Sequence, residues 1–266
     1  INIVYSPERV LPGNILQELR ANDRIIGGVS NTCSQEGSDF YKRFVDGDCL
    51  ITDVRTAELC KLTENSFRDV NIAFANELSI IADENEINIW ELIKLANLHP
   101  RVNILQPGPG VGGHCIAVDP WFIVNSNPNS SKIIRQAREI NDFKPRFILD
   151  KVHKLLNVIE KPINEIIITC LGLSFKPNID DLRESPSLYI AQELSNLNIK
   201  KLNIVEPNIT TLPGGFSRVA YLNDLNESID SSDLIILLVD HNEFKTLNQS
   251  IFEEKLLLDT RGIWSL

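Results

Sequence analysis

Methionine is absent from the 266-residue sequence, and cysteine is scarce, with five residues and no C-x-x-C pair. This spacing indicates neither a disulfide framework nor a zinc or other metal site, and it fits a reducing compartment such as the cytoplasm. The sequence also lacks the run of roughly 20 apolar residues that a membrane span requires. Its opening residues do not resemble a secretory signal peptide. Because translation starts at methionine, we expect the chain to begin inside a longer protein.

Positive charge is in deficit: 26 lysines and arginines stand against 36 acidic residues, so the net charge is −10. Nucleic acids and anionic membranes bind through basic patches, and this balance argues against both as main partners. It leaves room for a local positive pocket that binds a small anion. The 43% apolar and 23% charged content is that of a globular protein. The length suits about two domains of ~100–200 residues each.

The first half of the chain predicts helices beside a small piece of sheet. Residues 1–29 hold two strand-like runs that are too short for a domain and indicate the last strands of a larger sheet. A helix is expected over 33–47. Residues 53–85 predict a helix of ~29 residues, about 43 Å long, that crosses the protein or an oligomer interface. Shorter helices are expected over 87–97 and 130–156.

The long helix has two different faces. Its large apolar residues recur at three- and four-residue spacing and form one stripe: Phe67, Val70, Phe74, Leu78 and Ile81. Lys61 and Asn65 lie one turn apart on the side away from this stripe. Taken alone, a helix lysine is more often a solvated surface residue. In the later helix, Pro145 indicates a kink.

From about residue 163 strands alternate with helices. Buried strands are expected over 164–173, 201–207, 233–240 and 255–260. Helices are expected between them, near 187–197, 225–230 and 243–248. This order predicts an α/β fold in which an all-helical central region is followed by a parallel, doubly wound, Rossmann-like sheet. Such sheets bind ligands at the carboxyl ends of their strands, which here carry LGLSFKP, EPN and VDHNEF.

The stretch QPGPGVGGHCIAVDPW contains one G-x-G-x-x-G, formed by Gly108, Gly110 and Gly113. A dinucleotide loop follows a strand, opens a helix and is trailed by an acid about 20 residues on. Here prolines interrupt the motif and the nearby acid, Asp119, lies too close, so a dinucleotide loop is disfavoured. Glycines let the backbone approach a neighbour closely and leave Cys115 at the end of a tight loop. That cysteine is either buried filler or, beside His114, a reactive thiol.

Four segments carry a resemblance: YSPERVLPG, AELCKLTENSFRDVNIAFANEL, RVNILQPGPGVGGHCIAVDP and LGLSFKPNIDDLRESP. Together they resemble the UDP-glucose/GDP-mannose dehydrogenase family of nucleotide-sugar 6-dehydrogenases over almost the whole chain. The combination of G-G-[polar]-C-x-x-x-D with a K-x-x-x-N helix is specific to this likeness. His114 stands where UDP-glucose members have serine, which favours the bacterial UDP-N-acetyl-D-mannosamine branch.

The resemblance implies an architecture. Residues 1–32 would be the remnant of an N-terminal NAD-binding domain, 33–160 a central helical dimerisation domain, and 161–266 a UDP-sugar-binding domain. We expect a homodimer through the long central helix, a UDP-sugar substrate, NAD as cofactor, and no nucleic-acid or membrane partner. The cytoplasm is the expected compartment. The fragment alone is expected to be inactive.

The resemblance also implies a reaction, the oxidation of the sugar C6 alcohol to the acid with two NAD⁺, for surface polysaccharide synthesis. In this reaction Cys115 adds to the intermediate aldehyde and holds it as a thiohemiacetal. A second hydride leaves from the adduct to give a thioester, which water cleaves. Such a role requires a thiol that is not enclosed in hydrocarbon.

Four further residues match catalytic positions of the family. Lys61 and Asn65 match its K-x-x-x-N pair and would stabilise developing oxyanions. Asp119 matches an aspartate that holds a water or the lysine, and Glu8 matches a glutamate that activates the hydrolytic water. The alternatives are a turn or capping aspartate before a proline, and a loop glutamate paired with the adjacent arginine.

The anionic substrate and cofactor require positive charge and backbone donors. By the resemblance Lys176 contacts the UDP-sugar, Arg183 contacts NAD, and Arg101 reaches the site of a neighbouring subunit. The remaining substrate-binding candidates are Gly112, Gly113 and His114. Taken singly, each of these basic residues is more often part of a surface ion pair.

Other functions remain open. The sequence does not separate the mannosamine sugar from UDP-N-acetylglucosamine or UDP-glucose, and a non-catalytic UDP-sugar-binding and dimerisation module is a further alternative. A thiol hydrolase is disfavoured because no Cys–His–acid arrangement is evident. The other histidines are expected in loops or on the surface: His99, His153 and His241.

Overall fold

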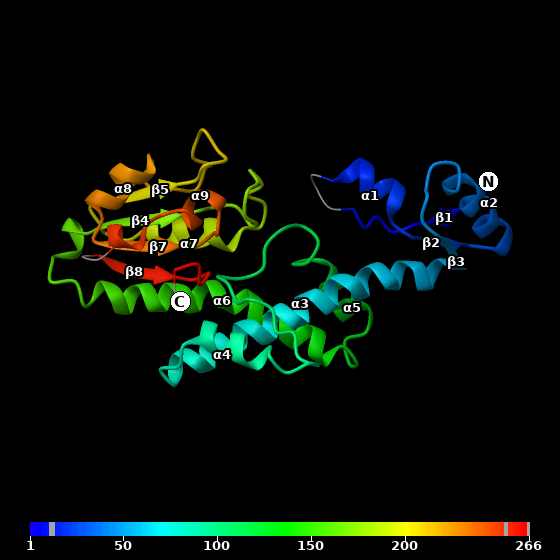
Figure 1. Ribbon diagram of the computed structural model, residues 1–266, viewed down its shortest axis with the longest axis horizontal. Helices are drawn as coiled ribbons and strands as arrows, with labels where there is room; N and C mark the ends of the chain where they lie inside the picture. Colours follow the sequence, from blue (N-terminus) through cyan, green and yellow to red (C-terminus); the bar gives the residue numbers. More distant parts are fainter. Residues whose placement is uncertain (11–13, 253–254, 265–266) are drawn as a thin grey trace. The chain divides into compact units, whose positions relative to one another are not determined.

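The computed structural model describes residues 1–10, 14–252 and 255–264. The chain divides into two compact units, Ile1–Phe67 and Arg68–Leu266. Each unit has its own sheet, of three strands in the first and five in the second (Figure 1). Over the described residues, no helix combines the length and the apolar character needed to cross a membrane.

The first unit is built on a sheet in the order β1-β2-β3. β1 (Val4–Tyr5) runs antiparallel to β2 (Arg24–Gly28), and β3 (Cys49–Asp53) runs parallel to β2. The two predicted strands and the predicted helix α2 (Asn31–Tyr41) are confirmed. Helix α1 (Ile15–Ala21) and strand β3 were not predicted from the sequence. Neither buries a continuous apolar run that would reveal it.

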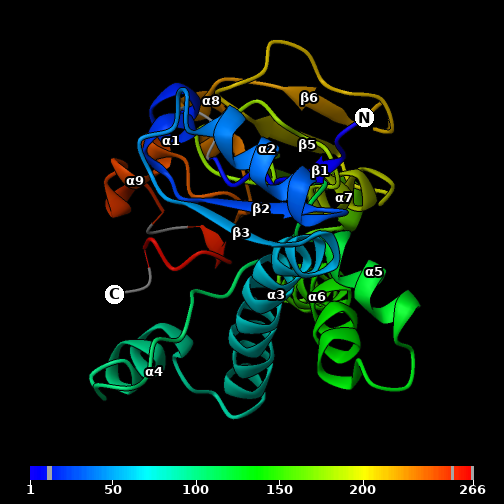
Figure 2. The same cartoon turned by 90° about the vertical axis from the view of Figure 1, so that its right-hand side faces the viewer.

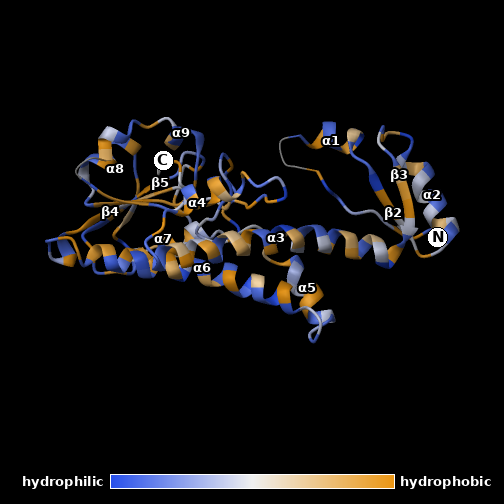
Figure 3. Cartoon of the chain, turned by 60° about the horizontal axis from the view of Figure 1, so that its bottom comes forward, coloured by the Kyte–Doolittle hydropathy of each residue, from blue (hydrophilic) through white to orange (hydrophobic). Residues whose placement is uncertain are grey.

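Helix α3 (Val54–Glu84) confirms the long helix, with 31 residues that continue from the first unit into the second. The positions it buries are small or polar, namely Ala57, Ser66, Asp69, Ala73, Ala75, Asn76 and Ala82. The large apolar side chains at Leu59, Phe67, Phe74 and Ile81 are exposed instead, and apolar residues recur along the helix in Figure 3. Most of the predicted apolar stripe therefore faces away from the core of this chain.

The rest of the central region consists of α4 (Ile89–Ala96), α5 (Asp119–Ser126) and α6 (Lys132–Leu156). Helices α3 and α6 lie beside each other in Figure 2. Successive contacts join residues further along both helices, so α6 runs in the same direction as the second half of α3. Pro145 lies inside α6, which continues past it to Leu156. Its ring packs at Gly110, where an added Cβ would lie 3.1 Å away.

The second unit carries a fully parallel sheet in the order β6-β5-β4-β7-β8. The four predicted strands are β4 (Ile167–Leu171), β5 (Lys201–Val205), β7 (Leu234–Leu237) and β8 (Leu256–Asp259). The edge strand β6 (Ala220–Leu222) was not expected, because its three residues are only partly buried.

Helices cover both faces of this sheet. They are α7 (Pro186–Ser195), α8 (Leu225–Ser231) and α9 (Asn242–Lys245), with short 3₁₀ turns at Ile163–Glu165 and Gln249–Phe252. Leu234 and Ile236 join the core beneath α6 and α7, whereas Ile235 and Leu237 join the core beneath α8 and α9. Alternate residues of one strand thus enter opposite cores, and the doubly wound prediction is confirmed.

Candidate active site

The backbone conformation of the segment that carries Cys115 requires glycine at several positions. Gly110 and Gly113 have φ angles of +147° and +80°, which other residues rarely adopt. A Cβ on Gly112 would lie 2.5 Å from the carbonyl oxygen of Glu184. The segment forms no helix before α5, so its G-x-G-x-x-G is not the strand–loop–helix of a dinucleotide site.

A row of buried side chains holds the beginning of this segment. Asn76 accepts the backbone N–H of Gly108 at 2.9 Å and donates to Asn141, also at 2.9 Å. Asn141 donates to Asp69 at 2.8 Å, and Asp69 pairs with Arg138 at 2.6 Å. Each of these side chains is at most 1% exposed. Burial raises the pKa of Asp69 against the opposing effect of the guanidinium, so the ionised carboxylate depends on its partners.

Cys115 is exposed, as a thiol nucleophile must be, and the buried-filler interpretation is therefore wrong. Its carbonyl oxygen accepts the N–H groups of Val118 and Asp119 at 3.0 and 2.8 Å. The chain thus turns directly after the cysteine and enters α5, with Asp119 as the first helical residue. The turn keeps the thiol and the aspartate on one short stretch of backbone.

The loop after β4 lies against the cysteine segment. The carbonyl oxygen of Arg183 accepts the N–H of Gly113 at 3.2 Å. Its guanidinium bonds to Asp181 at 2.6 Å, which raises the pKa of Arg183, and the nearby Cys115 adds to the same effect. The pKa of Asp181 falls to about 2, chiefly through Arg183 and to a lesser degree through His114. Four of the candidate residues therefore lie close together beside the loop after β4, namely Gly113, His114, Cys115 and Arg183.

In the first unit, Lys61 and Glu8 lie together. The Lys61 Nζ donates to the carbonyl oxygen of Glu8 at 2.8 Å, and Asn65 lies one turn further along α3. The Glu8 carboxylate accepts the N–H of Arg9 at 2.8 Å and pairs with Arg24 at 3.2 Å. Burial opposes its ionisation, but these bonds outweigh that effect and lower the pKa of Glu8. The ion-pair partner is thus Arg24 rather than the side chain of Arg9.

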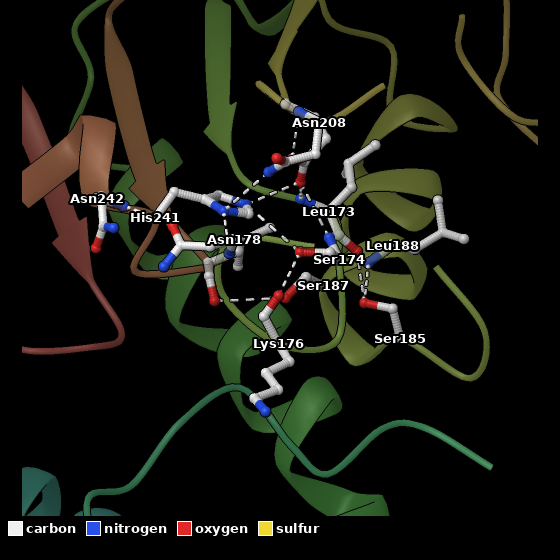
Figure 4. Close-up of polar contacts among 12 residues, drawn as sticks. Leu173, Ser174, Lys176, Asn178, Ser185, Ser187, Leu188, Asn208, His241 and Asn242 are labelled. Atoms are coloured by element: carbon white, nitrogen blue, oxygen red, sulfur yellow. Dashed lines mark hydrogen bonds and ion pairs between the residues drawn. The ribbon is translucent and has the colours of Figure 1, made fainter. Parts of the chain in front are cut away.

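A buried polar cluster joins the carboxyl ends of β4, β5 and β7 (Figure 4). Glu206 accepts the N–H of Leu173 at 2.7 Å and bonds to His241 Nε2 at 3.0 Å. His241 Nδ1 accepts the N–H of Asn178 at 2.9 Å, so Nε2 carries the ring proton and donates to Glu206. His241 lies in a loop, which was one of the two expected settings, but it is not on the surface, because its ring is fully buried where it links three loops.

Lys176 lies in the loop that this cluster shapes. Its carbonyl oxygen accepts the Ser174 hydroxyl at 2.8 Å, and its side chain leads away from the buried cluster in Figure 4. Arg101 is exposed just before the glycine segment, where its N–H donates to His99 at 3.3 Å. Among the described residues neither basic side chain forms an ion pair, so both charges are available to a ligand.

The sequence analysis missed Arg261, which follows β8. Its guanidinium pairs with Asp240 at 2.9 Å and lies against the glycine segment, since a Cβ on Gly108 would be 2.4 Å from Nη1. The signal was available, because an arginine that directly follows a parallel strand stands at the ligand edge of the sheet. Phe175 was also missed; its ring lies 2.9 Å from the position of a Cβ on Gly113.

These observations define the class of protein. It is a Rossmann-type α/β protein with an exposed cysteine beside loops that carry basic residues, at the ligand edge of its sheet. The chain belongs to the UDP-glucose/GDP-mannose dehydrogenase family. Its NAD binding domain matches residues 1–45, its central domain residues 55–143, and its UDP binding domain residues 169–266. The resemblance drawn from the sequence motifs is therefore confirmed.

Curated relatives extend this likeness along the chain. It is 54% identical over 268 residues to the UDP-N-acetyl-D-mannosamine dehydrogenase of Salmonella typhi, covering 99% of the chain and 64% of the relative. The enzyme of the same name from Escherichia coli (strain K12) is 53% identical with the same coverage. An NDP-N-acetyl-D-galactosaminuronic acid dehydrogenase of Ralstonia nicotianae (strain ATCC BAA-1114 / GMI1000) is 54% identical over 265 residues, covering 100% of the chain and 62% of the relative.

Solved structures show the same fold. The UDP-D-ManNAc dehydrogenase from Pyrococcus horikoshii has a TM-score of 0.86 at 38% identity, covering 98% of this chain and 61% of that chain. The native UDP-N-acetyl-mannosamine dehydrogenase from Staphylococcus aureus has a TM-score of 0.82 at 41% identity, covering 98% and 60%. The chain thus spans between 60% and 64% of the length of these relatives.

Proposed function

We propose that the protein carrying this chain is an NAD-dependent nucleotide-sugar 6-dehydrogenase, which oxidises UDP-N-acetyl-D-mannosamine to UDP-N-acetyl-D-mannosaminuronate for surface polysaccharide synthesis. The observation that carries this proposal is the exposed Cys115 on its glycine segment beside Arg183. The relatives at 53% and 54% identity support the mannosamine sugar. The free cysteines support a reducing compartment, and we place the protein in the cytoplasm.

Cys115 solves the problem of oxidising the same carbon twice. After the alcohol has become an aldehyde, the sulfur bonds to the aldehyde carbon, and the carbonyl electron pair moves to oxygen, which takes up a proton. Loss of hydride and a proton from this thiohemiacetal leaves a thioester. Water then displaces the thiolate and supplies the second oxygen of the acid. NAD⁺, held in part by Arg183, would supply the hydride acceptor for both oxidations.

The remaining catalytic roles concern charge and water. Lys61 and Asn65 would stabilise the oxyanions that form during addition and hydrolysis. Asp119 would orient a water or the lysine, and Glu8 would orient and activate the hydrolytic water. The lowered pKa of Glu8 supports this role, because it keeps the carboxylate ionised at neutral pH.

For the substrate, Lys176 supplies charge to the diphosphate and Arg101 reaches the site of a neighbouring subunit. Gly112 and Gly113 allow the backbone to approach the sugar, and His114 contacts it. The side chains at positions 176 and 101 form no ion pair within the described chain, which supports these roles.

The residues present suit NAD only in part. Arg183 is 64% exposed and bonds to Asp181 through Nε and Nη2, so its other N–H groups remain for a pyrophosphate. The glycine segment has been excluded as a dinucleotide loop. We therefore assign only Arg183 to the cofactor. The bounds 1–32, 33–160 and 161–266 stay predictions for the NAD-binding remnant, the dimerisation domain and the UDP-sugar-binding domain.

We also propose a homodimer that forms along α3. Leu59, Phe67, Phe74 and Ile81 are all exposed and recur at seven- or eight-residue spacing, which is the pattern of a helix–helix seam. Phe74→Asp should convert the dimer to a monomer in analytical ultracentrifugation, whereas Glu77→Gln on the same helix should not. A variant Phe74→Asp that sediments as the wild type would contradict this seam.

Replacing the thiol is the central experiment on the full-length protein. Cys115→Ser should abolish acid formation while UDP-sugar binding, measured by calorimetry, stays within about threefold of the wild type. Lys61→Ala should lower kcat by about 10²–10³-fold, as does loss of an oxyanion donor elsewhere. A fully active Cys115→Ser protein would contradict the thioester route. A wild-type protein that never forms the acid would instead favour the non-catalytic UDP-sugar-binding and dimerisation module.

Specificity needs a separate assay, because a relative named for N-acetyl-D-galactosaminuronic acid is as similar as those named for N-acetyl-D-mannosamine. The kcat/KM values for the UDP-activated forms of N-acetylmannosamine, N-acetylglucosamine, glucose and N-acetylgalactosamine should be compared. We expect N-acetylmannosamine to give the highest value. A higher value for another sugar would replace the proposed substrate without affecting the role of Cys115.

A further inference from the structure

A cavity of about 260 Å³ lies in the second unit between α3, the start of α4, α6 and the end of β8. Trp90 and Phe147 form aromatic walls, and the backbone of Pro107 and Gly108 forms part of the lining. None of the candidate catalytic or substrate-binding residues lines it. The cavity therefore borders the glycine segment without being part of the proposed active site.

Its lining contains two lysines and two carboxylates, and one of the lysines forms no ion pair within the described ranges. Asp83 pairs with Lys151, and the Asp259 carboxylate accepts the backbone N–H groups of Gly262 at 2.7 Å and of Trp264 at 2.8 Å. Lys144 is 3% exposed, and across the described ranges it forms no ion pair. The two lysines and two carboxylates of the lining balance in formal charge, but within the described residues no carboxylate forms an ion pair with the Lys144 ammonium.

The polar partner of Lys144 is a hydroxyl. Its Nζ donates to the Ser79 Oγ and lies 4.7 Å from the centre of the Phe147 ring. The Ser79 hydroxyl donates its own proton to the carbonyl oxygen of Asn76 at 2.6 Å, so towards the ammonium it acts only as an acceptor. A buried ammonium with such partners is poorly stabilised in the absence of an anion. Burial, and then the charge of Lys151, lower the pKa of Lys144 to about 7.

We propose that this cavity binds a small organic monocarboxylate, with Lys144 as the anchoring cation. A single buried ammonium matches one carboxylate rather than a phosphate dianion. The apolar body of the ligand would lie between Trp90 and Phe147. Pockets for drug-sized ligands occupy about 300–1,000 Å³, so this volume suits a smaller molecule than a UDP-sugar.

The aromatic wall is fixed in place. A Cβ on Gly262, whose φ is +69°, would lie 2.2 Å from the Trp90 ring, so the ring packs directly on this turn. The turn is held in its shape by the Asp259 carboxylate. A pre-formed wall lowers the entropic cost of binding a flat ligand.

Benzoate is a suitable probe, with benzamide as its neutral isostere, and calorimetry on the full-length protein measures both. We expect saturable benzoate binding in the millimolar range, which corresponds to about −4 kcal/mol, and at least tenfold weaker binding of benzamide. Lys144→Met should lose at least tenfold in affinity for benzoate, whereas Lys154→Met, on the exposed side of α6, should not change it. Lys144→Gln is the second variant if the first does not fold.

The wild type alone provides an independent test through pH. Only the protonated amine pairs with a carboxylate, so the affinity for benzoate should fall as pH rises above about 7, and binding near and just above pH 7 should take up protons. Asp83, Lys151 and Asp259 face the same cavity but belong to pairs or backbone bonds already made. Equal binding of benzoate and benzamide, a pH-independent affinity, or no saturable binding at pH 6 would each overturn the proposal. None of these outcomes depends on whether the proposed dehydrogenase reaction is correct.

Discussion

Two carboxylates at the ligand edge of the same parallel sheet, Glu206 and Asp181, each bond to a nitrogen-bearing side chain, and the two pairs differ in their access to water. In the Glu206–His241 pair both side chains are 0% exposed, and in the Asp181–Arg183 pair the values are 21% and 64%. Each carboxylate also accepts backbone N–H groups, so the local chemistry is similar. The two pairs therefore differ in burial and also in the partner, since the His241 ring accepts the Asn178 N–H at Nδ1 whereas Arg183 is a cation.

Burial separates a structural task from a chemical one. Around Glu206 and His241 the bonds lead to other loops of the chain, so that this pair fixes their shape. Around Arg183 the guanidinium is exposed and lies near enough to Cys115 to feel its charge, and its remaining N–H groups are open to a ligand. Exposed ion pairs contribute little to stability, whereas breaking a buried pair is costly. We expect substitutions in the two settings to affect different measurements.

The largest effect is expected at a second buried pair, Asp69–Arg138, where the side chains are 0% and 1% exposed. Asp69→Ala should lower the free energy of unfolding by about 3–5 kcal/mol, because the guanidinium loses its buried partner. Asp142 pairs with the same arginine but is 52% exposed, so Asp142→Ala should cost no more than about 1 kcal/mol. Urea denaturation measures both variants, and equal losses would contradict the importance of burial.

Glu206→Gln should lower the free energy of unfolding by a smaller amount, about 1.5–3 kcal/mol at pH 7, because charge-assisted hydrogen bonds are removed. Burial raises the pKa of Glu206, but the His241 bond and backbone N–H groups outweigh it and lower the value from its ordinary 4.5. The stability from this group is therefore present above pH 4.5 and is lost as the pH falls through the lower folded-state value. The free energy of unfolding of Glu206→Gln should lack this acid-dependent part.

The matched control is Glu193→Gln, at an exposed position of α7. Its unfolding curve should follow the wild type at neutral and acid pH. A Glu206→Gln protein whose acid dependence equals that of the wild type would mean that another group causes the loss.

Sequence reasoning succeeded where one segment carried its own signal. The apolar runs of β4 and β7 are continuous and buried, so both strands were predictable, whereas β6 is short and half-buried. Cys115 and Arg183 were identified from local motifs, and the structure brings them together. Their catalytic and cofactor roles stay predictions.

It failed where a side chain depends on a partner far along the chain. His241 follows a strand and was predicted to be a loop or surface residue, because nothing near it reveals Glu206, which comes from another strand. Asn76 was not singled out, since its role is to hold Gly108, 32 residues later. The exposed apolar face of α3 could not be separated from a core face, because periodicity shows amphipathicity but not what covers it.

The smallest effect on stability, within about 1 kcal/mol, is expected for Asp181→Asn in the open pair. The substitution should instead change the reactivity of Cys115. The carboxylate neutralises Arg183 and lies near His114, so its loss leaves the local positive charge uncompensated and favours the thiolate. Alkylation by iodoacetamide at neutral pH should become severalfold faster. This is less than the tenfold change that a difference of about 1.4 kcal/mol would give.

The matched control is Asp180→Asn, at an exposed neighbouring position, which should leave the alkylation rate unchanged. If Asp181→Asn destabilised the fold as much as Glu206→Gln and left the alkylation rate unaltered, the open pair would be structural after all.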